Sequence, residues 1–181
     1  MHGPAMSGWL LVALCGGTGA YCLVRMRGCR GEAREAAGGD ALMGWGMAAM
    51  AVPAAVFAPP RWWWVVYAVV FGAAALRALW PAGRGAHHVH HVVGSLAMVY
   101  MAVAMTSVGG HHGHAAAGIP LLTAGLLAYY AVYVLHSGAR LMPAAAPADG
   151  AATVPWSARA ELAPACRLAM GLAMLPMLLA L

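Results

Sequence analysis

The sequence predicts an all-α integral membrane protein, a bundle of six transmembrane helices with the N-terminus and the C-terminus outside. Composition is the first reason: 63% of the 181 residues are apolar, only 8% are charged, and the mean hydropathy is +0.74. Soluble domains usually carry about 25% charged residues. The second reason is that the apolar residues gather into six runs long enough to cross a bilayer. Polar or proline-containing segments separate these runs.

Four of the expected helices have a local signal at one of their ends. The first closes at an Arg-rich loop around Cys29, and the second starts after Asp40, which we interpret as a helix N-cap. Pro59 and Pro60 separate the second helix from the third, whose opening WWWVVY is typical of a headgroup boundary. The fourth follows Pro81. The expected helices cover about residues 7–24, 41–58, 62–80, 88–108, 119–135 and 163–181 of a single domain 1–181, with a flexible inner linker at about 137–160.

The positions of the arginines predict the orientation. With the N-terminus outside, nine of the ten arginines and all five acidic residues fall on the inner side, and only Arg61 falls on the outer side. Inner loops carry the excess of basic residues in membrane proteins. The first apolar run lacks a basic lead-in and is followed by arginines, so we expect a retained helix rather than a cleaved signal.

The fourth expected helix carries a histidine cluster that leads into a methionine ladder. Six of these residues fall within an arc of about 100° on a helix, whereas His88 points away from that arc. The six are His87, His90, His91, Met98, Met101 and Met105. Thioether sulfur beside imidazole suits Cu(I) better than any hard cation. This pattern therefore predicts a soft-metal site.

Two other expected helices carry methionine at helical spacing. The residues are Met43, Met47 and Met50 in the second helix and Met170, Met174 and Met177 in the sixth. The three helices run in the same direction, so we expect their stripes to face one another and, with the four histidines, to bind Cu(I) for copper transport, storage or delivery. Accessory candidates are Asp40, Cys166, His111, His112, His114 and His136.

Simpler interpretations of these residues stay open. Methionine is a flexible gap filler, so each stripe also fits packing alone. His88 also fits an interfacial group, and the three loop histidines fit either a polar loop or an outer collecting site. Arg167 is interpreted as snorkelling to headgroups. The four cysteines fit free thiols, although Cys15, Cys22 and Cys29 recur every seven residues and could add soft ligands.

Two other functions compete with copper handling. A haem-b electron carrier would need an axial ligand from each of two facing helices, such as Met98 or His91 opposite His136. A structural membrane subunit would use the methionine faces for contact and hold no metal. Nucleophile, metalloprotease and phosphate-loop motifs are missing from the sequence, so catalysis is not expected. The expected partners are the bilayer, a metal ion and another membrane or extracytoplasmic copper protein, with no nucleic acid.

Two stretches of the chain resemble a known family. They are GDALMGWGMAAMAVP at 39–53 and HHVHHVVGSLAMVYM at 87–101, and they are similar to the signature regions of the actinobacterial membrane family called domain of unknown function 5134. The resemblance covers nearly the full length. It implies a multi-pass plasma-membrane protein of a high-GC Gram-positive bacterium and brings no activity with it. The family's recurring positions would be Asp40, Met43, Met47, Met50, His88, His91, Met98 and Met101.

Overall fold

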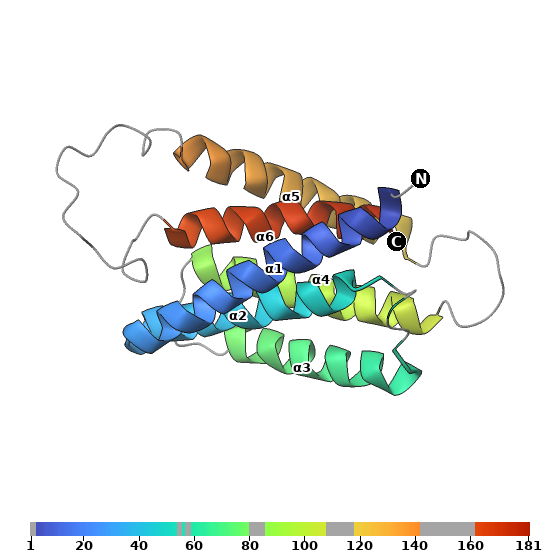
Figure 1. Ribbon diagram of the computed structural model, residues 1–181, viewed down its shortest axis with the longest axis horizontal. Helices are drawn as coiled ribbons and strands as arrows, with labels where there is room; N and C mark the ends of the chain where they lie inside the picture. Colours follow the sequence, from blue (N-terminus) through green and yellow to red (C-terminus); the bar gives the residue numbers. More distant parts are fainter. Residues whose placement is uncertain (1–2, 54–55, 57–58, 80–85, 108–117, 142–161) are drawn as a thin grey trace.

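The computed structural model describes residues 3–53, 56, 59–79, 86–107, 118–141 and 162–181, and these residues form six α-helices and no strand (Figure 1). The helices are α1 (Gly3–Gly28), α2 (Gly31–Ala51), α3 (Arg61–Leu79), α4 (Ala86–Ser107), α5 (Pro120–Leu141) and α6 (Leu162–Leu179). The predicted all-α class is confirmed. Residues 137–141 belong to α5, so the expected linker begins later than predicted, and the rest of it lies outside the described residues.

The second helix differs most from its expected bounds. It begins at Gly31, which has a φ of +56° and allows the chain to turn sharply after α1. It ends at Ala51, because the following Pro53 lacks an N–H and disfavours helix in the residue before it. Asp40 therefore lies in the interior of α2. The N-cap interpretation of Asp40 is wrong.

The helices pack as three consecutive antiparallel pairs, α1 with α2, α3 with α4 and α5 with α6. Contacts of α2 with α4 and α6, and of α1 with α6, join these pairs into one elongated bundle. Both termini lie at the same end of this bundle (Figure 1). The central position of α2 means that side chains from α1, α4 and α6 can all meet its faces.

Five of the six helices are long and apolar enough to cross a membrane; α2 is the exception. The first half of α2 carries Glu32, Arg34, Glu35 and Asp40. From Ala41 onward the helix supplies a buried row of small residues and methionines, namely Ala41, Met43, Gly44, Gly46, Met47 and Ala48. The outer surface carries large apolar side chains instead, including Leu76, Leu121 and Leu135. Such a surface is suited to lipid, because it would aggregate in water.

A close helix contact joins α1 and α2 at two glycines. A Cβ atom added to Gly44 would lie 2.9 Å from the Cα and N atoms of Gly19 and 3.0 Å from the Cys15 carbonyl oxygen. Those are backbone atoms, which cannot move aside without separating the helices. Glycine is therefore required at this crossing, as is common where membrane helices approach closely.

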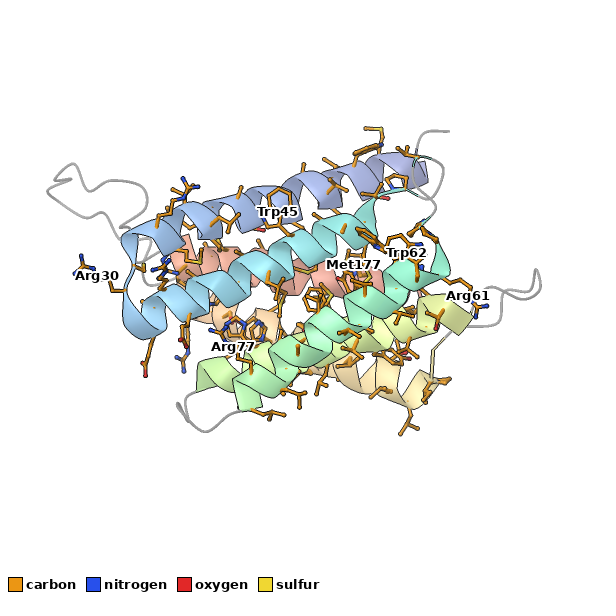
Figure 2. The ribbon with its side chains drawn as sticks, turned by 90° about the horizontal axis from the view of Figure 1, so that it is seen from below. Arg30, Trp45, Arg61, Trp62, Arg77 and Met177 are labelled. Atoms are coloured by element: carbon orange, nitrogen blue, oxygen red, sulfur yellow. The ribbon has the colours of Figure 1, made fainter. Side chains whose placement is uncertain are left out.

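Charged and aromatic residues mark the two ends of the bundle. The odd-numbered helices α1, α3 and α5 each carry arginine in the last turn. Figure 2 shows Arg30 at one end, and Arg61 and Trp62 at the other. At the Arg61 end, the Arg61 guanidinium donates to the Thr106 carbonyl oxygen at 3.3 Å, and Trp62 is exposed. Near the Arg30 end, Arg77 of α3 pairs with Glu35 of α2 at 3.7 Å.

Candidate functional site

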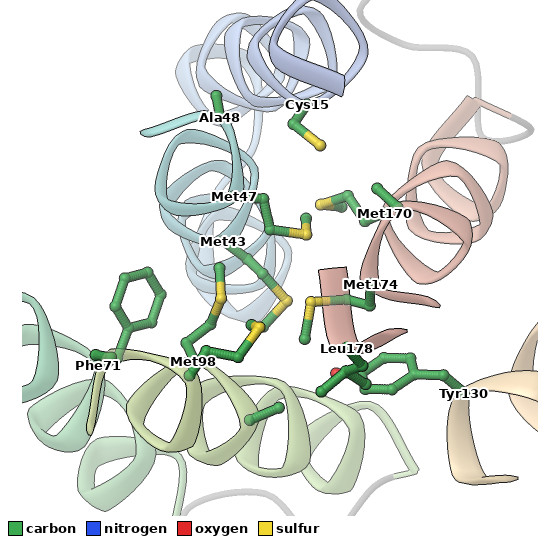
Figure 3. Close-up of a cluster of buried hydrophobic side chains, with 14 of the residues drawn as sticks. Cys15, Met43, Met47, Ala48, Phe71, Met98, Tyr130, Met170, Met174 and Leu178 are labelled. Carbon is green, nitrogen blue, oxygen red and sulfur yellow. The ribbon is translucent and has the colours of Figure 1, made fainter. Parts of the chain in front are cut away.

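The methionine stripes of α2, α4 and α6 converge in the centre of the bundle. We call this set the thioether cluster. It consists of Met43, Met47, Met98, Met101, Met170 and Met174, none more than 4% exposed. Figure 3 shows methionine side chains from the three helices pointing toward one another, with the fully buried Cys15 of α1 beside them. The expectation that the three stripes face each other therefore agrees with the structure.

The third methionine of each stripe lies outside the cluster. Met50 and Met177 are partly buried and pack against the core, whereas Met105 is 41% exposed. Met105 follows Met101 by about one helical turn, so the face of α4 that carries the stripe leaves the core at this point. The structure therefore separates Met105 from the other predicted ligands of α4.

Two tyrosines place hydroxyl groups next to the thioethers. Tyr67 of α3 donates its O–H to the Met98 sulfur at 3.4 Å. Tyr130 of α5 is 1% exposed, and its hydroxyl has no hydrogen-bond partner among the described residues. The Tyr130 hydroxyl and the Met43 sulfur lie 3.5 and 2.9 Å from the point where a Gly94 Cβ would stand. An unpaired buried hydroxyl is costly, so it marks a place where a further group could bind.

A buried ionic triad lies on the same three helices, toward the Arg30 end of the bundle. Asp40 of α2 is 2% exposed, and its Oδ2 accepts a hydrogen bond from Nε of Arg167 on α6 at 3.1 Å. Its Oδ1 lies 3.4 Å from Nε2 of His91 on α4. The interpretation of Arg167 as a snorkelling side chain is wrong, because the Arg167 side chain is 14% exposed and faces the carboxylate.

Such a triad is expensive to bury. Moving charges out of water costs several kcal/mol per ion, and only close pairing offsets that cost. Ionisable groups inside membrane proteins are therefore functional candidates. The triad also links α2, α4 and α6. These are the same helices that form the thioether cluster.

His90 has different partners from His91. Its ring stacks on Tyr133 of α5, with ring centroids 3.9 Å apart and planes 8° from parallel. Its Nδ1 lies 3.4 Å from the Tyr129 hydroxyl. Sequence reasoning did not identify these tyrosines, although their spacing of four residues places both on one face of α5.

Two thiols, Cys22 of α1 and Cys166 of α6, lie near enough to interact with each other. Arg25 and Asp40 lie near enough to interact electrostatically with both. Sequence reasoning noted each cysteine separately, as part of the heptad spacing on α1 and as an extension of the α6 stripe. Their proximity could not be read from that spacing.

The remaining predicted ligands are distributed as follows. His136 is exposed on α5. The side chains of His87 and His88 and the whole of His111, His112 and His114 lie outside the described part of the chain. In the part that the structure describes, His, Cys, Asp and Glu side chains form no group of three that could hold a metal ion. Methionine sulfur would therefore have to supply most ligands of any soft-metal site in this region.

The fold and these buried sites define a helical membrane protein with a sulfur-rich interior. The chain belongs to the family described as domain of unknown function (DUF5134), whose model matches residues 32–181. The family expected from the two signature stretches is thereby confirmed. Comparisons with curated proteins and with solved structures gave no match.

Proposed function

We propose that this protein binds Cu(I) at the thioether cluster and serves in copper transport, storage or delivery across or within the plasma membrane. The observation that carries the proposal is the convergence of six buried methionines from three helices that are distant in sequence. Packing alone requires apolar volume but no particular element, and Leu would serve as well. Here the sulfur-bearing side chains of three helices converge, with a buried thiol beside them (Figure 3).

The donor set suits Cu(I) on chemical grounds. Thioether and thiol sulfur select soft cations, whereas Ca²⁺, Mg²⁺ and Mn²⁺ prefer oxygen. A monovalent ion also costs less to hold in a low-dielectric interior than a divalent ion does. The unpaired Tyr130 hydroxyl beside Met43 is a further polar group that an occupant of the cluster could satisfy.

We also propose how the copper ion would enter and leave the bundle. With both termini outside, the Arg61 end faces outward, and the ionic triad lies toward the inside. His91 would then stand at the inner end of the metal path, held in place by Asp40. A second membrane or extracytoplasmic copper protein would supply or receive the ion at the outer end.

The first test is metal analysis of detergent-purified protein, with a visible spectrum of the same sample. We expect Cu(I) to bind and no Soret band to appear. A Soret band would replace the proposal with the haem-b reading, and protein that binds neither group after loading would leave a structural subunit.

The second test separates ligands from packing. Met47, Met101 and Met174 supply one sulfur from each helix, and the variant changes all three to Leu. Met98 is kept because its sulfur accepts the hydrogen bond of the buried Tyr67 hydroxyl. A Met→Leu change in a core costs under about 1.5 kcal/mol and removes the thioether. We expect helicity and melting temperature to stay near those of the parent, while Cu(I) binding in competition with a chromophoric chelator falls at least tenfold. The control variant changes Met6, Met105 and Met142 to Leu. Parent-like Cu(I) affinity in the cluster variant would overturn the proposal.

A further inference from the structure

An open apolar groove lies on the surface of the bundle between α3 and α4. Its volume is about 350 Å³, and its lining is almost wholly apolar. Three valines that line it, Val65, Val69 and Val103, are each more than half exposed. Each helix also contributes an alanine, Ala68 of α3 and Ala102 of α4, and these small side chains leave the space open. The groove therefore has the width and chemistry to hold a hydrocarbon chain.

A cation stands at one end of this groove. Thr106 of α4 lines the groove, and its carbonyl oxygen accepts a hydrogen bond from the exposed Arg61 guanidinium at 3.3 Å. Arg61 precedes Trp64, the first groove residue of α3, by three residues, or about one helical turn. A guanidinium carries five N–H donors in a fork that matches phosphate oxygens, so an arginine that gives one donor to a carbonyl keeps others for an anion.

The charge of Arg61 is isolated at its end of the bundle. The side-chain carboxylates among the described residues, Glu32, Glu35 and Asp40, belong to the first half of α2 at the Arg30 end. The last turns of α1, α3 and α5, with their arginines, lie at that end too. Arg61 is thus paired with a neutral carbonyl and with no side-chain carboxylate in the part of the chain that the structure describes. An anion is the complementary partner for this position.

Two tryptophans indicate the depth of the groove in the membrane. Trp62 is 62% exposed, and its ring meets the edge of the Trp63 ring with centroids 6.1 Å apart. Figure 2 shows Trp62 at the same end as Arg61. Exposed tryptophans gather at headgroup level, and α3 rises about 12 Å from Arg61 to Val69. The groove therefore begins below the headgroups and runs into the acyl region.

We propose that this groove binds one anionic phospholipid, with its phosphate on the Arg61 guanidinium and one acyl chain against Ala68 and Ala102. A free phosphate would leave the apolar groove empty, and an acyl chain without a phosphate would leave the cation without an anion. The lipid satisfies both. It would also hold α3 and α4 together at this end, because it contacts both helices.

The experiment cross-links lipid to the protein in a bilayer. Full-length protein is reconstituted into phosphatidylcholine vesicles that contain a trace of phosphatidylglycerol with a photoactivatable diazirine in one acyl chain. Peptide mass spectrometry locates the cross-links, and photoactivatable phosphatidylcholine serves as the headgroup control. We expect phosphatidylglycerol to label residues 64–69 and 102–106 about fivefold more than phosphatidylcholine does, which is the factor that one basic residue contributes near an anionic membrane surface.

Two variants test the two halves of the site. Arg61→Gln should remove the preference for phosphatidylglycerol in the groove, and Ala68→Leu should lower groove labelling by both lipids because the larger side chain fills the space. The matched controls are Arg77→Gln, an exposed arginine at the other end of α3, and Ala73→Leu, an exposed alanine of α3 outside the groove. Both controls should be labelled as the parent is. Melting temperatures near that of the parent show that each variant is folded, and Arg61→Gln decides alone if Ala68→Leu is not.

The possible results support or overturn the lipid site without reference to copper. Equal labelling of the groove by the two lipids, or an unchanged preference in Arg61→Gln, would mean that lipid merely surrounds the bundle, and the proposal would fail. A groove that neither lipid labels would have another occupant, such as a second copy of the chain, and the proposal would fail as well. None of these readouts involves the thioether cluster, so failure here leaves the proposed function in place.

Discussion

Arg167 and Asp40 lie 127 residues apart in the sequence, yet Nε of Arg167 donates to Oδ2 of Asp40 at 3.1 Å in the interior of the bundle. Both side chains are largely shielded from solvent. Nε2 of His91 lies 3.4 Å from the other carboxylate oxygen, Oδ1 of Asp40. The contact fixes α6 against α2 beside the sulfur-rich core.

The first prediction concerns this ion pair. Asp40→Asn should lower the stability of the bundle by about 3–5 kcal/mol, because Arg167 keeps its buried charge but loses the carboxylate. Arg167→Met should have a similar effect through the unpaired carboxylate. The double variant should cost clearly less than the sum of the two singles. Thermal melting in detergent measures all three proteins, and additive losses would show that the pair contributes no coupling energy.

The second prediction concerns the crossing of α1 and α2. Gly44→Ala should destabilise the protein by about 1–3 kcal/mol, because the new methyl group meets backbone atoms of α1 that cannot yield. Gly17→Ala is the matched control in α1, since a Cβ there meets nothing within 4 Å. It should be neutral or stabilising by up to about 1 kcal/mol through helix propensity. Equal melting temperatures for the two variants would contradict the close crossing.

The third prediction compares two methionines one turn apart on α4. Met101 is 2% exposed and belongs to the thioether cluster, whereas Met105 is 41% exposed. Met101→Leu should weaken Cu(I) binding, by the 10 to 100-fold typical of losses around a metal site. Met105→Leu should leave the affinity unchanged. A chelator competition assay on both variants decides the matter, and an effect of Met105 as large as that of Met101 would mean that burial does not select the ligands.

The fourth prediction concerns orientation in the membrane. Single cysteines placed at Gly110 and at Gly150 of cysteine-free protein should react differently with a membrane-impermeant maleimide in intact cells. Labelling is expected at position 110 only, because nine of the ten arginines lie on the side that holds position 150. Permeabilised cells supply the control, in which both positions should react. Reaction at position 150 in intact cells would reverse the proposed topology.

The sequence by itself determined the membrane class, the approximate positions of the helices and the three methionine stripes. These features depend on local composition and on the period of 3.6 residues per turn, and both can be read along one segment. The family could also be recognised from two short stretches that contain Asp40, Met43, His91 and Met98.

Only the tertiary structure decided which of these residues meet. Hydropathy and capping preference suggested that the second helix starts after Asp40, but the chain is helical from Gly31 onward. A charged residue can lie inside α2 because α4 and α6 supply its partners. The proximity of Cys22 to Cys166 and the exclusion of Met105 from the core likewise depend on how helices distant in sequence cross. Periodicity along one helix specifies which face is apolar, but the crossing of the helices determines which atoms on that face touch.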